Sequence, residues 1–142
     1  MPMSLFRSRC PKEAARATFG FVLPPGGTLP PGEYEMVEWY CDDPGCDCRR
    51  AFLQVVPRGQ PGPIFASINF GWETRAFYKA KMPYDPDAPK EITAGSLDPI
   101  NPQSPLAPAI LDIFHQVVAE GELAGHLKRH CEMFKTTLPT KG

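Results

Sequence analysis

Hydrophobic and polar positions alternate in several short runs of this chain. Two runs rich in aromatic and β-favouring residues, 34–40 and 51–56, are separated by ten residues. Residues 64–70 place an apolar side chain at every second position, and the short run 19–23 is also β-like. This alternation is typical of strands that bury one face. We therefore predict an antiparallel sheet in which 34–40 pairs with 51–56.

Residues 75–81 show a similar pattern. Ala76, Tyr78 and Ala80 fall on one side of an extended chain, and residues 71–74 before them can form a turn. We interpret 75–81 as a further strand. The predicted sheet then has four or five short strands within residues 19–82.

The C-terminal part of the chain follows helical spacing instead. Apolar residues recur at intervals of three and four from Leu106 to Gly121, and again from Leu123 to Phe134. The short joint favours an antiparallel helical hairpin over residues 109–138. Because the strands precede the helices in the sequence, we expect an α+β fold with the helices packed on the sheet.

Residues 83–108 separate the predicted sheet from the helices and contain seven prolines in 26 residues. Proline is excluded from strand interiors and from most of a helix, so we expect an extended proline-rich crossing. Asn101, Gln103 and Ser104 in this segment could contact a ligand, or could hold the crossing through side-chain hydrogen bonds.

The N-terminal residues 1–18 carry four basic side chains and few large apolar ones. We interpret them as a basic arm that contributes little to the core. A chain of 142 residues is long enough to bury a core of its own, and we expect residues 1–142 to form a single domain.

Charge and apolar stretches narrow the class of protein. The 15 Lys and Arg residues nearly balance the 16 Asp and Glu residues, which argues against broad electrostatic capture of nucleic acid or of an anionic membrane. No run approaches the roughly 18–20 apolar residues of a membrane span, and the N-terminal residues lack the apolar core of a secretory signal. We therefore expect a cytoplasmic protein with no membrane partner, whose cysteines are reduced.

Three of the five cysteines fall within eight residues, in the predicted turn between 34–40 and 51–56. Asp, Pro and Gly residues around them favour a tight reversal. Zinc prefers a tetrahedron of thiolate and imidazole ligands, so the pattern Cys41-x4-Cys46-x-Cys48 predicts three ligands of a structural zinc site. The alternative is three ordinary reduced thiols.

The fourth ligand must come from elsewhere in the chain. On a helical wheel, His130 lies about 40° from the centre of the apolar stripe of the last helix, Cys131 about 60° and His126 about 80°. We therefore predict a zinc site with three cysteines and one histidine, formed by Cys41, Cys46, Cys48 and His130. Three alternatives for the fourth position stay open, and they are Cys131, Cys10 and His126. His115 is expected to face outward.

The pair Cys46-Asp47-Cys48, completed by later ligands, is loosely similar to the first half of a SWIM-type zinc finger, whose second half is Cys-x-His. Here the later residues read His130-Cys131. We transfer none of that family's binding roles to this chain.

The sequence predicts a zinc-stabilised binding or adaptor module without catalytic activity, most readily for a protein partner. No nucleophile–base pair or phosphate-binding motif favours an enzyme. One alternative is a zinc hydrolase in which Asp42, Asp43 or Asp47 acts as general base, although these residues also suit a turn. The other is a module for single-stranded nucleic acid, with aromatic and basic side chains as its surface, although core packing would use the same aromatic side chains. The aromatic candidates are Trp39, Tyr40, Trp72 and Tyr78.

Overall fold

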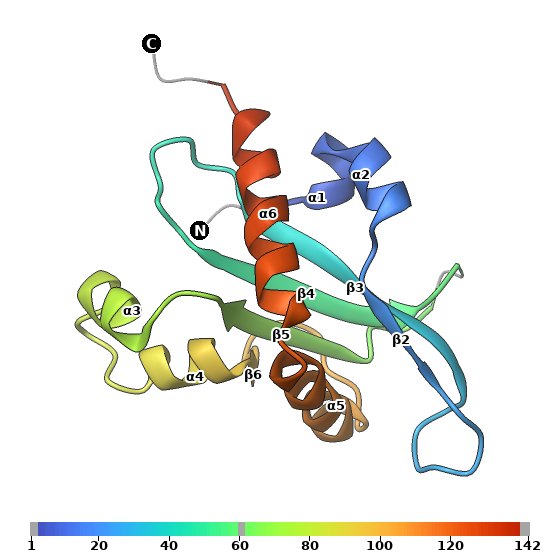
Figure 1. The fold of residues 1–142 in the computed structure, drawn as a ribbon. Coiled ribbons are helices and arrows are strands. Elements are labelled where there is room, and N and C mark those ends of the chain that lie inside the picture. Colours follow the sequence, from blue (N-terminus) through green and yellow to red (C-terminus); the bar gives the residue numbers. More distant parts are fainter. Residues whose placement is uncertain (1–2, 60–61, 140–142) are drawn as a thin grey trace.

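The computed structural model describes residues 3–59 and 62–139, and in this part of the chain an antiparallel sheet packs against helices (Figure 1). The predicted α+β class is therefore confirmed. Residues 1–2 and 140–142, at the ends of the predicted domain, lie outside the described ranges. Among the described helices, none combines the length and the apolar character that crossing a membrane requires.

The sheet contains six strands within the described residues. Four of them lie in the predicted range 19–82, and two lie outside it. Its order is β1-β3-β4-β5-β6, and β2 also pairs with β3. β1 lies along the C-terminal half of β3 and β2 along its N-terminal half. The bounds are β1 (Met3–Leu5), β2 (Gly20–Leu23), β3 (Gly32–Cys41), β4 (Arg50–Pro57), β5 (Ala66–Gly71) and β6 (Ser96–Leu97).

The predicted central pair is confirmed in β3 and β4, which run antiparallel with Trp39 opposite Phe52. Every second residue of β3 is buried, because one face of the strand lies against the core. Three residues of this buried row are Tyr34, Met36 and Tyr40. The fourth is the carboxylate of Glu38, which is only 6% exposed.

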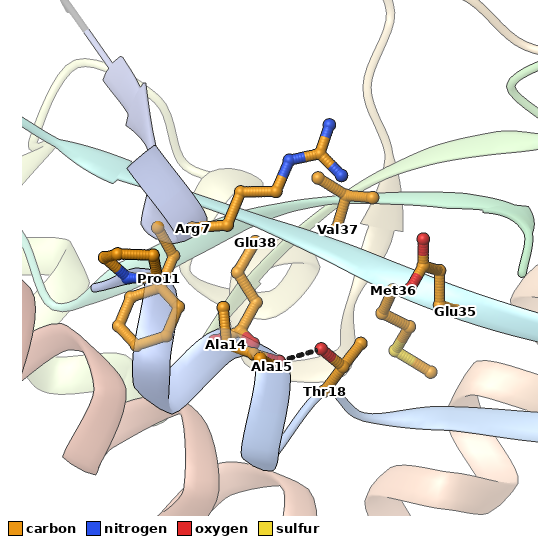
Figure 2. A pocket seen from close by; sticks show the side chains of 10 residues that line it. Arg7, Pro11, Ala14, Ala15, Thr18, Glu35, Met36, Val37 and Glu38 are labelled. Atoms are coloured by element: carbon orange, nitrogen blue, oxygen red, sulfur yellow. Dashed lines mark hydrogen bonds between the residues drawn. The ribbon is translucent and has the colours of Figure 1, made fainter. Parts of the chain in front are cut away.

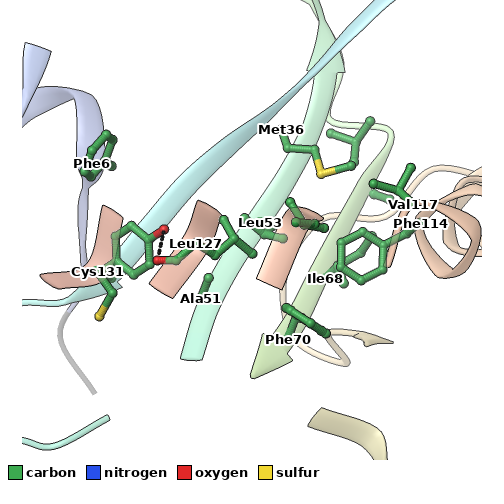
Figure 3. Close-up of a cluster of buried hydrophobic side chains, with 14 of the residues drawn as sticks. Phe6, Met36, Ala51, Leu53, Ile68, Phe70, Phe114, Val117, Leu127 and Cys131 are labelled. Atoms are coloured by element: carbon green, nitrogen blue, oxygen red, sulfur yellow. Dashed lines mark hydrogen bonds between the residues drawn. The ribbon is translucent and has the colours of Figure 1, made fainter. Parts of the chain in front are cut away.

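Two helices at the predicted positions, α5 (Ala107–Ala119) and α6 (Glu122–Thr136), supply the other side of the core. Leu127 of α6 and Phe114 of α5 pack toward Leu53 and Ile68 of the central strands (Figure 3). In Figure 1, α5 is seen nearly end on, whereas α6 is seen from the side as it crosses the strands of the sheet. The antiparallel packing that we expected from the short joint is therefore not confirmed.

Residues 75–81 form a helix, α3 (Arg75–Lys81), and not the strand that their alternation predicted. The hydroxyl of Thr74 accepts a hydrogen bond from the backbone N–H of Phe77 at 3.2 Å and so caps the first turn. Tyr78 points back to the sheet and donates a hydrogen bond to the carbonyl of Arg49. The alanines and lysines of this segment are good helix formers, and the capped turn prevails over the period-two pattern.

The proline-rich crossing is only partly extended. It contains helix α4 (Ala88–Ala94) and strand β6. The helix tolerates Pro89 because this residue lies in its first turn, where a backbone N–H is not needed. Beyond β6 the crossing is held to β5 by side chains. The amide of Gln103 donates to the carbonyl of Ser67 at 2.7 Å and accepts from its N–H at 2.9 Å. This favours the role of a strap over that of a ligand contact for Gln103.

The N-terminal segment is more structured than expected. After β1 it forms α1 (Phe6–Arg9) and α2 (Pro11–Arg16). Phe6 is 2% exposed and its ring contacts the rings of Tyr40 and His130. The prediction that residues 1–18 contribute little to the core was therefore wrong, because a single aromatic side chain anchors α1 over the sheet.

Candidate metal centres

The three clustered cysteines lie where β3 passes into β4. Cys41 is the last residue of β3, and the chain then reverses before Arg50 begins β4. The carboxylate of Asp43 accepts from the N–H of Gly45 at 2.9 Å, and its carbonyl accepts from the N–H of Cys46 at 3.1 Å. These local hydrogen bonds fold the segment back so that Cys46 and Cys48 approach Cys41.

The sulfur atoms of Cys41, Cys46 and Cys48 all lie within 4.8 Å of one another. In a tetrahedral zinc–thiolate site with bonds of about 2.3 Å, neighbouring sulfurs are roughly 3.8 Å apart. The three thiols are therefore close enough to hold one metal ion after a small adjustment. All five cysteines are within the described residues, and each of them is a thiol and not part of a disulfide.

Helix α6 contacts the loop between β3 and β4 through Lys135. We call this loop, residues 42–49, the cysteine loop. The ammonium group of Lys135 donates to the carbonyls of Cys41 and Cys46 at 3.3 and 3.2 Å. These two bonds join both sides of the loop to the last turns of the helix. They also place a positive charge beside the sulfur cluster, where it favours thiolates.

The thiol pKa values reflect this crowding. Burial alone would raise the pKa of Cys46, but hydrogen bonds from Cys48 and Cys41 and the charge of Lys135 outweigh it, and the pKa is lowered. Burial, together with the hydrogen bond and the charge of Cys46, raises the pKa of Cys48 to about 12. Cys46 therefore loses its proton more readily than Cys48.

Cys131 lies on α6 near the same cluster, although it is not one of the three cysteines whose sulfur atoms lie within 4.8 Å of one another. It is 6% exposed, and it lines a cavity of about 490 Å³ together with Cys48 and Lys135. Burial and the charges of Glu132 and Cys41 raise its pKa to about 11, although Lys135 acts in the opposite direction. Cys131 thus lies near enough to Cys41 for their charges to interact.

Two other candidates for the fourth ligand are placed elsewhere. Cys10 lies at the junction of α1 and α2, where burial and the charge of Glu13 raise its pKa. His130 is fully buried, as its position on the apolar stripe predicted. However, its Nδ1 lies 2.8 Å from Oε1 of Glu38, and the structure does not bring it into the group of three thiols.

The aspartates of the cysteine loop are engaged in local contacts. Asp42 accepts a hydrogen bond from the hydroxyl of Ser4 at 2.5 Å, and Asp43 forms the turn described above. Asp47 forms an ion pair with Arg49 at 3.0 Å, and the hydrogen bonds from Arg49 lower its pKa. These contacts match the turn-forming interpretation better than that of a general base.

Glu38, His126 and His130 form a second group whose donor atoms all lie within 4.8 Å of one another. Glu38 also lines a cavity of about 340 Å³ between β3 and the N-terminal helices, where Pro11 and Ala14 of α2 lie across from the strand (Figure 2). Both histidines are among the ligands that the sequence suggests, whereas Glu38 is not. The sequence signal for Glu38 is its position in β3. It is a charged residue between Met36 and Tyr40, in the row of alternate residues that faces the core.

The comparisons with known proteins give no family for this chain. Its sequence matches no known protein family model, and no curated protein or solved structure is significantly similar to it.

Proposed function

We propose that this chain is a zinc-stabilised binding module, in which one zinc ion is held by Cys41, Cys46, Cys48 and Cys131. The ion would join the loop between β3 and β4 to α6 and would have a structural role. The observation that carries the proposal is the convergence of three thiols within 4.8 Å at the start of β4. A closed set of four thiolates around a tetrahedral ion is the usual form of a structural zinc site.

Cys131 is a better fourth ligand than the His130 predicted from the sequence. Nδ1 of His130 is already within hydrogen-bond distance of Glu38. Cys131 shares a cavity with Cys48 and lies one helical turn before Lys135, whose ammonium group contacts the cysteine loop. Choosing Cys131 changes the predicted site from three cysteines and a histidine to four cysteines.

The charges around the cluster support a site with four thiolate ligands. Four thiolates and one zinc ion carry two negative charges. Lys135 lies on one side of the loop and contacts its carbonyls, and Arg50 begins the strand after it. These cations would offset the charge of the site without occupying a coordination position.

The face beside the loop is suited to a protein partner. A cavity of about 450 Å³ is lined by Phe77 and Tyr84 as well as by loop residues, among them Arg49 and Arg50. Tyr84 is 81% exposed. Tyrosine and arginine are enriched at protein interfaces, because both combine apolar area with hydrogen-bonding groups. Zinc would hold the loop in the conformation that presents this face.

A zinc hydrolase is the weaker alternative. It would require three protein ligands, one open position and a nearby carboxylate free to accept a proton. Asp43 and Asp47 are engaged in a turn and in an ion pair, and in our proposal Cys131, which lines a cavity with Cys48, closes the fourth position.

Metal content tests the zinc proposal directly. Protein purified without an affinity tag and depleted of metal is titrated with Co²⁺, whose bond to thiolates gives an intense charge-transfer absorption. We expect this absorption to saturate with one equivalent, and to be abolished by Cys46→Ser and strongly weakened by Cys131→Ser. Cys10→Ser is the matched control and should leave it unchanged. A full absorption in Cys46→Ser would overturn the site.

The partner is tested by comparing wild type with Tyr84→Ser in a pull-down from native extract. A partner that is retained by wild type and lost with Tyr84→Ser supports the proposed face. Equal recovery with both proteins would place the partner elsewhere. Because Tyr84 is exposed, the variant should fold normally, and circular dichroism checks this.

A further inference from the structure

A second cluster of metal-binding side chains lies deeper in the molecule. Glu38 comes from β3, and His126 and His130 come from successive turns of α6, so that both imidazoles point to the same side of the helix. Oε1 of Glu38 lies 2.8 Å from Nδ1 of His130, and Oε2 lies 3.7 Å from Nε2 of His126. The centroids of the two imidazole rings are 4.1 Å apart.

Two polar atoms of this cluster have no hydrogen-bond partner. Nε2 of His126 and Nε2 of His130 are both enclosed, and neither is hydrogen bonded within the described residues. The side chain of His130 is 0% exposed and that of His126 is 14% exposed. Leaving a buried polar atom unpaired costs about 1–3 kcal/mol, so two adjacent cases require an explanation.

The surrounding side chains fix the cluster in place. The ring of Phe6 stacks on the ring of His130, with the centroids 4.2 Å apart. The hydroxyl of Tyr40 donates to Oε1 of Glu38 at 2.5 Å. The carboxylate of Glu13 lies 4.0 Å from Nε2 of His130. The donor atoms are therefore held in position before any ion enters.

We propose that Glu38, His126 and His130 form a second metal site, which binds a divalent transition-metal ion of borderline softness such as Zn²⁺ or Fe²⁺. Glu38 would supply a carboxylate oxygen, His126 its Nε2 and His130 its Nδ1. Ligands at about 2.0–2.1 Å in a tetrahedron are roughly 3.3 Å apart, and the distances of 2.8 and 3.7 Å in the cluster lie on either side of this value.

Glu13 has a separate role in this site. When Nδ1 of His130 binds the ion, its Nε2 carries the ring proton. Metal-bound histidines usually donate that proton to a carboxylate or carbonyl, and Glu13 is the carboxylate on that side. The ion would thus explain the unpaired nitrogen of His126 directly. Nε2 of His130 lies 4.0 Å from Oε1 of Glu13 and would become paired only when that carboxylate moves closer.

The competing explanation is a buried ion pair between Glu38 and a protonated His130. That pair accounts for the contact of 2.8 Å but leaves Nε2 of His126 at 3.7 Å from Oε2 of Glu38, beyond hydrogen-bond distance. The donor set also differs from that of the cysteine loop. Imidazole and carboxylate ligands select borderline and harder ions, whereas thiolates select softer ones.

Cobalt titration distinguishes the two proposed sites, and it shows which of them does not bind metal if one proposal is wrong. Metal-free wild-type protein should bind two equivalents of Co²⁺, of which only one produces thiolate charge-transfer absorption. His126→Gln should bind one equivalent and keep that absorption in full. His115→Gln, on the exposed face of α5, is the matched control and should bind two.

The outcomes are separable. One equivalent in wild type, unchanged by His126→Gln, would overturn the second site and leave the proposed function standing. One equivalent without thiolate absorption, lost in His126→Gln, would support the second site while the proposed function fails. Glu13→Gln should weaken cobalt binding at the second site about 10–100-fold, as expected for an outer partner, and an unchanged affinity would contradict that role.

Discussion

Glu38 occupies a position in β3 where burial would favour an apolar side chain. Its carboxylate is stabilised by hydrogen bonds with Tyr40 and His130. In metal-free protein, Glu38→Ala removes one partner of a buried polar cluster, and we expect it to lower the free energy of unfolding by about 3–5 kcal/mol. Urea denaturation measures this. Glu35→Ala, on the opposite face of β3, is the control, and a similar loss in that variant would contradict the role of burial.

Asp98 stabilises the strap that follows β6. Burial alone would raise its pKa, but hydrogen bonds from the side chain of Asn69 and from the backbone of Ile100 and Asn101 outweigh burial and lower it. A carboxyl whose pKa is lower in the folded state stabilises the fold above its unfolded pKa, and this contribution is lost as the pH falls.

We therefore expect Asp98→Ala to cost about 1–2 kcal/mol of unfolding free energy at pH 7. The difference from wild type should shrink as the pH falls below the ordinary carboxyl value of 3.8. Chemical denaturation of both proteins between pH 7 and pH 3 measures this trend. A difference that is constant over this range would show that the carboxylate charge does not matter.

Individual site residues were predictable where the sequence clusters them. The three clustered cysteines lie close together because the chain reverses within the eight residues from Cys41 to Cys48. Glu38 and His130 are 92 positions apart, and only the packing of α6 on β3 brings them together. The fourth ligand was uncertain for the same reason, since a helical wheel ranks burial but does not say which neighbour a buried side chain meets.

Two glycines in helical parts of the chain have opposite requirements. Gly95 ends α4 with φ of +90°, and a Cβ there would lie 2.4 Å from Cε2 of the buried Phe114. Gly125 lies within α6, and a Cβ there would meet nothing within 4 Å. We expect Gly95→Ala to destabilise the protein by about 2–4 kcal/mol and Gly125→Ala to stabilise it by about 0.5–1 kcal/mol.

Thermal unfolding followed by circular dichroism compares the two variants with wild type. The opposite signs matter more than the magnitudes, because both changes add the same methyl group. If both variants were destabilised equally, the packing of α4 against Phe114 would not be as described.

At the level of elements, the strands with strong alternation and the helices with a clear apolar stripe were predictable. The segment 75–81 was not, because Tyr78 fits a strand position on the same side as Ala76 and Ala80 and a helix position equally well. The cap that Thr74 gives the first turn decides for the helix. The helix in the crossing was missed because proline was counted as a breaker, whereas Pro89 occupies a first-turn position.

Across the whole molecule, the proposed zinc site joins the loop between the two central strands, β3 and β4, to the C-terminal helix. A ligand that binds only the folded state stabilises it by about 2.7 kcal/mol at a free concentration one hundred times its dissociation constant. We expect a chelator to lower the melting temperature of His126→Gln, in which only the cysteine site would remain. For a chain of this size the shift is about 5–10 °C.

Cys46→Ser combined with His126→Gln is the matched control for that experiment. It should melt at the lower temperature with or without chelator. A chelator-dependent shift that survives in this double variant would place the stabilising ion outside both clusters. If single unfolding transitions are seen throughout, they would also support the prediction of one domain over residues 1–142.

X-ray absorption at the zinc edge tests the central claim most directly, on His126→Gln loaded with one equivalent of zinc. The proposed site predicts four sulfur neighbours at about 2.3 Å. Cys131→Ser in the same background should reduce them to three and introduce a lighter neighbour. A first shell of nitrogen and oxygen at about 2.0 Å would contradict the account, because it would show that zinc is not held by the cysteine loop.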